Sequence, residues 1–165
     1  MNHIVTVKFS ETQIGMILDN IEEEIDEELE KGGKERGAIS TPITAKHFSE
    51  AAFSKYLTGE IMVYDDSFWA NERKKGYLFG SNCIIYGRIV DAKKDVLKMN
   101  LSIRKDKIRI PANYILAVVY DLDNVPEVSL VGWKSALELK KSKRKDKYFA
   151  MTSSSLNALL PMMWH

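Results

Sequence analysis

The sequence has one cysteine, Cys83, among its 165 residues. A single cysteine excludes an internal disulfide and a cysteine-based zinc site, and it fits a reducing compartment, so we expect a cytoplasmic protein. No apolar run approaches the ~20 residues that a membrane helix requires. The sequence also lacks a basic segment followed by an apolar stretch, which is the pattern of a secretory signal. We therefore expect an intracellular protein without a membrane partner.

Histidine and net charge are also scarce. His3, His47 and His165 are too scattered for a local metal motif, and we expect them at the surface or at the chain ends. The net charge is +1, so the chain as a whole lacks the basic character of a nucleic-acid-binding domain. The charge is uneven, because residues 22–30 are strongly acidic and residues 140–147 strongly basic. A basic run can steer phosphates, but we favour a solvated loop between two elements.

The hydrophobic content of 45% suits a single domain with one sizeable core. A helix is predicted from Ser10, which forms a capping box with Gln13, to the glycine pair at 32–33. Its apolar residues repeat at helical spacing, so its many glutamates form the solvent-exposed face. A loop over 34–43 and a second helix over 44–57 follow.

From residue 61 onward the pattern is that of short strands. We expect strands at 61–64, 77–86, 88–93, 97–103, 114–120 and 127–131, a short helix at 133–141, a strand at 148–151 and a helical turn at 155–160. The run 115–119 is apolar on both faces, which predicts a central strand. Helices before a mixed sheet indicate one α/β domain over 1–165, with an N-terminal helical extension over 1–43 and a core over 44–165.

The most informative motif is Asp91-Ala92-Lys93, at the end of the apolar run 83–90. In an extended strand, side chains i and i+2 share a face, so Asp91 and Lys93 would stand side by side. A carboxylate that can hold a divalent cation beside a fixed ammonium is the minimum equipment for phosphodiester hydrolysis. The alternative interpretation is an ordinary ion pair at the end of a strand.

Glu50 is the second candidate, on the predicted helix over 44–57. It shares a face with Phe53 and Leu57, which must point inward, so Glu50 is expected at the edge of the core. A carboxylate there is costly without a partner. It is either a boundary residue that pairs with a lysine or a carboxylate aimed into a site.

The order of these elements resembles the PD-(D/E)xK superfamily over roughly residues 44 to 163. The resemblance is carried by the helix around Glu50, the strand ending in Asp91-Ala92-Lys93, the apolar strand after Pro111, and the run from Val128 to Trp133. It implies a restriction-endonuclease-like fold, with a mixed central sheet flanked by helices and preceded by the N-terminal amphipathic helix. The implied activity is that of a DNA endonuclease that depends on Mg²⁺ or Mn²⁺.

The resemblance also implies roles for single residues. Glu50 matches the helix acid and Asp91 the strand acid that holds the metal, while Lys93 positions or deprotonates the attacking water. Asn82, nine residues before Asp91, stands where the family has its first strand acid. Its amide oxygen can still touch a cation but lacks the charge that hard cations favour.

Asn82 leaves three interpretations open. The protein could be a weak or inactive enzyme that serves as a DNA- or protein-binding module, for example from a virus or mobile element. Asn82 could instead be a substitution that traps an inactive form. In the third interpretation Asp65 or Asp66 replaces the missing acid, although paired aspartates at a strand end usually begin a turn.

Two further segments are candidates for partner contacts. Arg73, Lys74, Lys75 and Lys94 are candidate nucleic-acid contacts, because basic residues interleaved with aromatic ones can bind a strand. For residues 71–76 we favour an ordinary polar hairpin loop. The apolar C-terminal residues 162–164 either pack on the core or form a homodimer contact.

Overall fold

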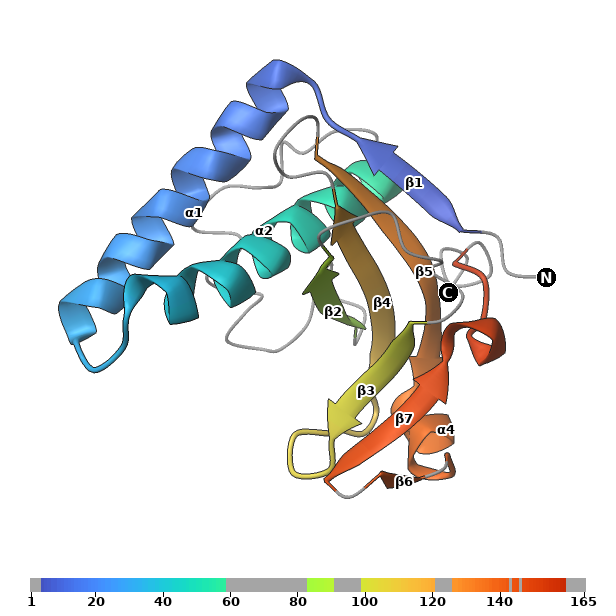
Figure 1. Ribbon diagram of the computed structural model, residues 1–165. Coiled ribbons are helices and arrows are strands. Elements are labelled where there is room, and N and C mark those ends of the chain that lie inside the picture. Colours follow the sequence, from blue (N-terminus) through green and yellow to red (C-terminus); the bar gives the residue numbers. More distant parts are fainter. Residues whose placement is uncertain are drawn as a thin grey trace.

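The computed structural model describes residues 4–58, 83–90, 99–120, 126–142, 144–145 and 147–159. Its first half holds β1 (Val5–Lys8), α1 (Glu11–Lys31) and α2 (Arg36–Thr58). Its second half is mostly strands, namely β2 (Cys83–Ile89), β3 (Asn100–Arg104), β4 (Asn113–Tyr120), β5 (Glu127–Ser135), α4 (Ala136–Lys140), β6 (Arg144–Lys145), β7 (Tyr148–Thr152) and the 3-10 turn η2 (Ser153–Ser155). The prediction of a mixed α/β fold is confirmed (Figure 1).

Four strands form a central sheet in the order β1-β5-β4-β2. β5 is antiparallel to both of its neighbours, whereas β2 runs parallel to β4, with Ile85 opposite Ile115. β4 lies inside the sheet, and every residue of it after Asn113 is buried. The prediction of a central strand over 115–119 is therefore confirmed.

Alternating side chains of β4 face two separate hydrophobic cores. Ile115 and Ala117 pack with residues of α1 and α2, on the face of the sheet that the helices cover in Figure 1. Val118 packs on the opposite face with Leu101 of β3 and Phe149 of β7. These two strands belong to a second sheet of order β3-β7-β6. In the described part of the chain, the central sheet thus has helices on one face and a second sheet with the short α4 on the other, rather than helices on both.

The first helix forms as predicted. Ser10 Oγ accepts a hydrogen bond from the Gln13 backbone N–H (3.2 Å), and Gln13 Oε1 accepts one from the Ser10 N–H (2.9 Å). The helix ends where Gly32, at φ +74°, donates its N–H to the Leu29 carbonyl. Its apolar stripe enters the core through Ile17, Ile21 and Ile25.

The loop predicted over 34–43 is wrong, because α2 begins at Arg36 and contains Pro42. Proline inside a helix removes one backbone hydrogen bond, which is why its presence predicted a break. Tertiary packing outweighs that cost, since Ile39 and Ile43 are both buried in the core between the helices and the sheet. Residues 36–43 therefore belong to the same helix as Glu50, across the 43/44 boundary drawn from the sequence.

The break predicted at Gly87, between the strands 77–86 and 88–93, is not formed. β2 continues through this residue, which pairs with Ala117, and Val90 then donates its N–H to the Val119 carbonyl. Gly87 serves a close helix contact instead. A Cβ built there would overlap Ser49 Oγ and lie 2.8 Å from the Ala45 carbonyl oxygen. Residues 61–64, 77–82 and 91–98 lie outside the described residues.

The C-terminal elements are shifted from their predicted places. β5 extends to Ser135, so Trp133 is a strand residue and the helix α4 covers only 136–140. Trp133 is half-buried against the core and donates its indole N–H to the Ala158 carbonyl (2.9 Å). The predicted turn over 155–160 is displaced to η2, whereas β7 confirms the strand at 148–151. Within the basic run, which was expected as a loop, β6 pairs with β7.

Candidate functional site

Glu50 lies in the most buried part of α2. Every residue from 47 to 54 is buried, and Glu50 itself is 7% exposed. The spacing predicted that Glu50 lies at the edge of the core. The structure places it inside the protein instead. A buried carboxylate requires either polar compensation or a proton. This placement makes Glu50 more than a surface charge.

The contact between Ser49 and Gly87 brings this part of α2 against β2. Only a glycine fits at position 87, because the Ser49 side chain and the Ala45 carbonyl fill the space that a Cβ would need. Glu50 is the next residue of the helix, and β2 is the strand that precedes Asp91 in the chain. The sequence signal for this contact was a glycine within the apolar run 83–90, at the break between the predicted strands 77–86 and 88–93.

The other predicted catalytic and metal-binding residues, Asn82, Asp91 and Lys93, lie outside the described residues, as do the alternatives Asp65 and Asp66. β2 begins one residue after Asn82 and ends two residues before Asp91. A strand of this length spans about 20 Å, so the two positions are attached to its opposite ends. In the part of the chain that the structure describes, no group of three or more His, Cys, Asp or Glu side chains could hold a metal ion.

The candidate nucleic-acid residues Arg73, Lys74, Lys75 and Lys94 lie outside the described ranges too. A different basic surface is formed by described residues. A pocket of about 460 Å³ lies between β2 and the β3–β7 sheet, and a smaller one of about 290 Å³ adjoins it. The two share Tyr86, Ser102 and Tyr148, so we treat them as one β2–β3 groove. Its remaining lining residues are Ile84, Arg88, Asn100, Ile103, Arg104, Lys107, Arg109, Tyr114 and Ala150.

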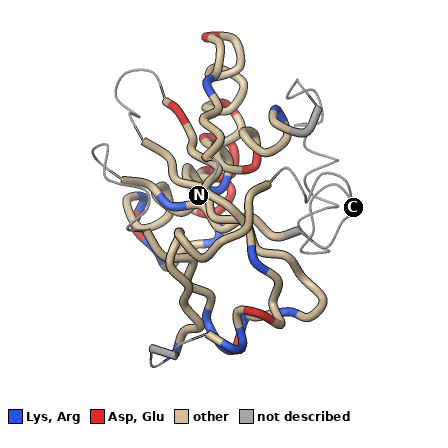
Figure 2. Tube along the Cα trace, turned by 90° about the vertical axis from the view of Figure 1, so that its right-hand side faces the viewer, with Lys and Arg blue, Asp and Glu red and all other residues tan. Residues whose placement is uncertain are grey.

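Among the described residues, the charged side chains that line the β2–β3 groove are all cations. They are Arg88, Arg104, Lys107 and Arg109, and all four are exposed. One nearby carboxylate, Asp106, pairs with Arg104 at 3.0 Å and 3.1 Å. In Figure 2, blue segments gather in the lower part of the molecule, where β3 and β7 lie, whereas most red segments lie above. The groove is thus locally basic in a protein whose net charge is only +1.

Three tyrosines give the groove an aromatic character. Tyr114 is buried and accepts a hydrogen bond on its hydroxyl from the Arg109 backbone N–H (2.9 Å). Burial raises the pKa of the Tyr114 hydroxyl, and the hydrogen bond opposes this. Tyr86 is half-buried, and Tyr148 is 42% exposed. The sequence predicted β3 only as a strand with one solvent-exposed face. The groove itself was missed, because the residues of β2 and β3 come together only in the tertiary structure.

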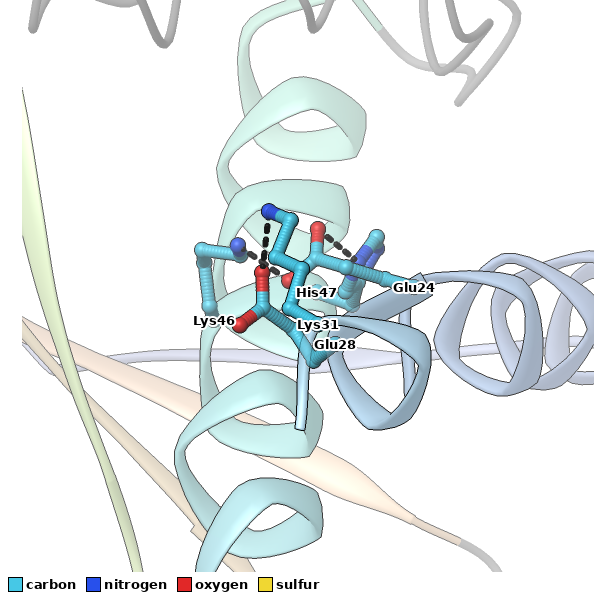
Figure 3. A network of polar contacts seen from close by, with 5 residues as sticks. All are labelled: Glu24, Glu28, Lys31, Lys46 and His47. Carbon is cyan, nitrogen blue, oxygen red and sulfur yellow. Dashed lines mark hydrogen bonds and ion pairs between the residues drawn. The ribbon is translucent and has the colours of Figure 1, made fainter. Parts of the chain in front are cut away.

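A second polar cluster joins the two long helices (Figure 3). Glu24 of α1 accepts hydrogen bonds from Lys46 Nζ (2.5 Å) and pairs with His47 Nε2 (3.2 Å), both on α2. Burial raises the pKa of the Glu24 carboxyl, but these partners outweigh it and hold the pKa at about 2. His47 is 2% exposed, so its predicted place at the surface is wrong. The geometry is that of a link between helices.

No family model, curated protein or solved structure matches this chain. The resemblance to the PD-(D/E)xK superfamily therefore depends on the residues quoted for it. Among the described helices, none combines the length and the apolar character needed to cross a membrane.

Proposed function

We propose that this protein is a Mg²⁺- or Mn²⁺-dependent DNA endonuclease of the PD-(D/E)xK type, with a restriction-endonuclease-like core. The observation that carries the proposal is the contact between Ser49 and Gly87. It brings the buried turn that bears Glu50 against β2, the strand that runs toward Asp91-Ala92-Lys93 in the chain. A helix acid beside a strand that leads into an acid-x-lysine motif is the arrangement that the resemblance implies.

The donor set fits a hard divalent cation. Carboxylate oxygens are the ligands that Mg²⁺ prefers, and Asp91 and Glu50 would supply them, directly or through water. The ion would supply charge stabilisation for the phosphate. Lys93, two residues after Asp91, would orient or deprotonate the attacking water. Burial makes Glu50 a stronger electrostatic partner than an exposed acid, because interactions are screened less inside a protein.

The length of β2 favours Glu50 over Asn82 as the residue that would bind the metal ion together with Asp91. About 20 Å of extended strand separates the attachment points of Asn82 and Asp91, whereas the reach of two side chains to one metal ion is much shorter. We therefore expect Asn82→Asp to leave the activity nearly unchanged. A large gain of activity would instead indicate that the charge missing at Asn82 was the defect.

Plasmid nicking tests the proposal. The wild-type protein should nick supercoiled DNA with Mg²⁺ or Mn²⁺ and not in EDTA. Asp91→Ala, Lys93→Ala and Glu50→Gln should each lower the rate at least 100-fold, in line with the loss of a metal ligand or general base. Asp19→Asn, at an exposed position of α1, is the matched control. Activity that survives both Asp91→Ala and Lys93→Ala would sink this mechanism.

A second candidate is a non-catalytic binding module on the same scaffold. It is favoured by the β2–β3 groove, since all the charged side chains among its described lining residues are cations. Calorimetry separates the candidates. Heat of Mg²⁺ or Mn²⁺ binding that Asp91→Ala abolishes supports the nuclease, whereas DNA binding without any cation binding supports the module.

Two properties expected from the sequence remain proposals. We propose a cytoplasmic location, on the single cysteine, and a homodimer, in which residues 162–164 form the contact. Those residues lie outside the described ranges. Light scattering of the full chain, compared with the Trp164→Ser variant, tests the dimer.

A further inference from the structure

We propose that the β2–β3 groove binds a single-stranded segment of nucleic acid, with phosphates on its four cations and bases stacked on its tyrosines. This interaction goes beyond the proposed nuclease activity, because it requires neither a metal ion nor cleavage. The ligand is identified by the chemistry of the groove, which combines cationic and aromatic side chains on both walls.

Each wall presents a tyrosine next to an arginine. On β2, Tyr86 and Arg88 are two residues apart and so share a face, and both line the groove. On the other wall, Tyr148 of β7 stands directly opposite Arg104 of β3 in the antiparallel register. Both members of this cross-strand pair line the groove as well. The same combination of an aromatic ring and a cation thus faces inward from both sides.

The cations favour a polyanion over other ligands. The lining side chains contain four cations and, among the described residues, no carboxylate. Asp106 already pairs with Arg104, and a phosphate can replace it because both partners are exposed. A phosphate backbone gains affinity from such a row through counterion release. An acidic peptide would meet the same charges but would leave the tyrosines without a stacking partner.

The tyrosines favour unpaired bases over a duplex. Tyr148 is 42% exposed, which is a large apolar area to leave in water at the mouth of a groove. The floor is fixed, since Tyr114 is buried and its hydroxyl is held by the Arg109 backbone. Bases in a duplex stack on one another and cannot enter between side chains, whereas single-stranded bases stack readily on aromatic rings. The volume of about 460 Å³ falls within the range of small-ligand pockets, about 300–1,000 Å³.

Fluorescence anisotropy in EDTA tests the proposal with the full chain and a labelled oligothymidylate of about 12 nucleotides, within the usual site size. We expect the single strand to bind at least tenfold more tightly than a hairpin duplex of the same length. Tyr148→Ala should weaken binding about 5- to 100-fold, whereas Tyr148→Phe, which keeps the ring, should bind within about twofold of wild type. The double variant R88A/K107A should lower the log–log salt slope by about 1.4.

A matched double variant, K34A/K140A, removes two exposed cations outside the groove and should change the affinity less than twofold. Thermal melting establishes that all variants are folded. Equal binding of single strand, duplex and polyglutamate, or wild-type affinity for Tyr148→Ala, would overturn the proposal. The two proposals can fail separately. If the wild-type protein binds the single strand but does not nick DNA, only the nuclease proposal is contradicted. If the wild-type protein nicks DNA and Tyr148→Ala binds the single strand as tightly as wild type, only the groove proposal is contradicted.

Discussion

Gly87 of β2 lies directly against Ser49 of α2, at a separation that leaves no room for a side chain on the strand. We predict that Gly87→Ala destabilises the protein by about 1–3 kcal/mol, because the new Cβ overlaps the helix. Adding Ser49→Ala should recover less than half of this loss, since the Ala45 carbonyl oxygen, 2.8 Å from the Cβ position, remains. Urea unfolding at neutral pH measures each free energy.

The control for this prediction is Gly15→Ala in α1. Nothing lies within 4 Å of a Cβ at Gly15. The substitution should therefore stabilise the protein by about 0.5–1 kcal/mol through helix propensity alone. If Gly87→Ala and Gly15→Ala changed stability in the same favourable direction, the close contact between α2 and β2 would be wrong.

From the contacts of Glu24 with Lys46 and His47 we predict a specific loss of stability in acid. The pKa of Glu24 is lowered from an unfolded value near 4.5 to about 2 in the folded protein. A depressed pKa stabilises the folded state above the unfolded pKa, and this contribution disappears as pH falls from 4.5 toward 2. We expect Glu24→Gln to lose roughly 1–3 kcal/mol at pH 7 and much less near pH 2. Glu23→Gln, at an exposed position, should show no such pH-dependent difference.

The contacts of Lys55 attach the end of β1 to the two helices. Its Nζ donates to the Lys8 carbonyl (2.6 Å) and to Gln13 Oε1 (3.0 Å), and lies 5.7 Å from the centre of the Phe9 ring. Lys55→Met should cost about 1–2 kcal/mol, because it removes the hydrogen bonds and the cation–π contact. Lys34→Met should stay within about 0.5 kcal/mol. Faster amide exchange in β1 of Lys55→Met would locate the effect, and unchanged exchange would contradict it.

Pro42 tests whether α2 begins before residue 44. In a continuous helix, Pro42→Ala restores a backbone donor and removes a ring clash, so we expect a gain of about 1–2 kcal/mol. In a loop, the same change would destabilise, because proline restricts the unfolded chain. Chemical denaturation decides the sign, with Thr41→Ala, which is exposed on the same helix, as the reference.

Local signals predicted the elements that depend on local chemistry. The capping box at Ser10 fixed the start of α1, and the two-sided apolar run over 115–119 identified β4. The errors arose where tertiary packing outweighs a local rule. Pro42 is held in a helix by the buried Ile39 and Ile43, and Gly87 lies within a continuous strand and contacts a helix instead of separating two strands.

The site divides in the same way. Helical spacing placed Glu50 at the edge of the core, and the structure buries it more deeply than spacing alone predicts, while its role in a site stays a prediction. The β2–β3 groove could not be found from the sequence, because its two walls, which carry Arg88 and Arg104, belong to two different sheets. Asp91 and Lys93 remain predictions, since they lie outside the described residues.

The pairing of β1 with β5 has a consequence for how the chain folds. Val5 stands opposite Leu130, so the first strand finds its partner only after most of the sequence has been synthesised. Contacts over such separations close slowly, and until then β5 presents an unpaired edge that can join another chain. Removal of the first nine residues should therefore promote aggregation during refolding, even though α1 and α2 can still form. We therefore expect the N-terminal strand to keep the edge of β5 from pairing with another chain.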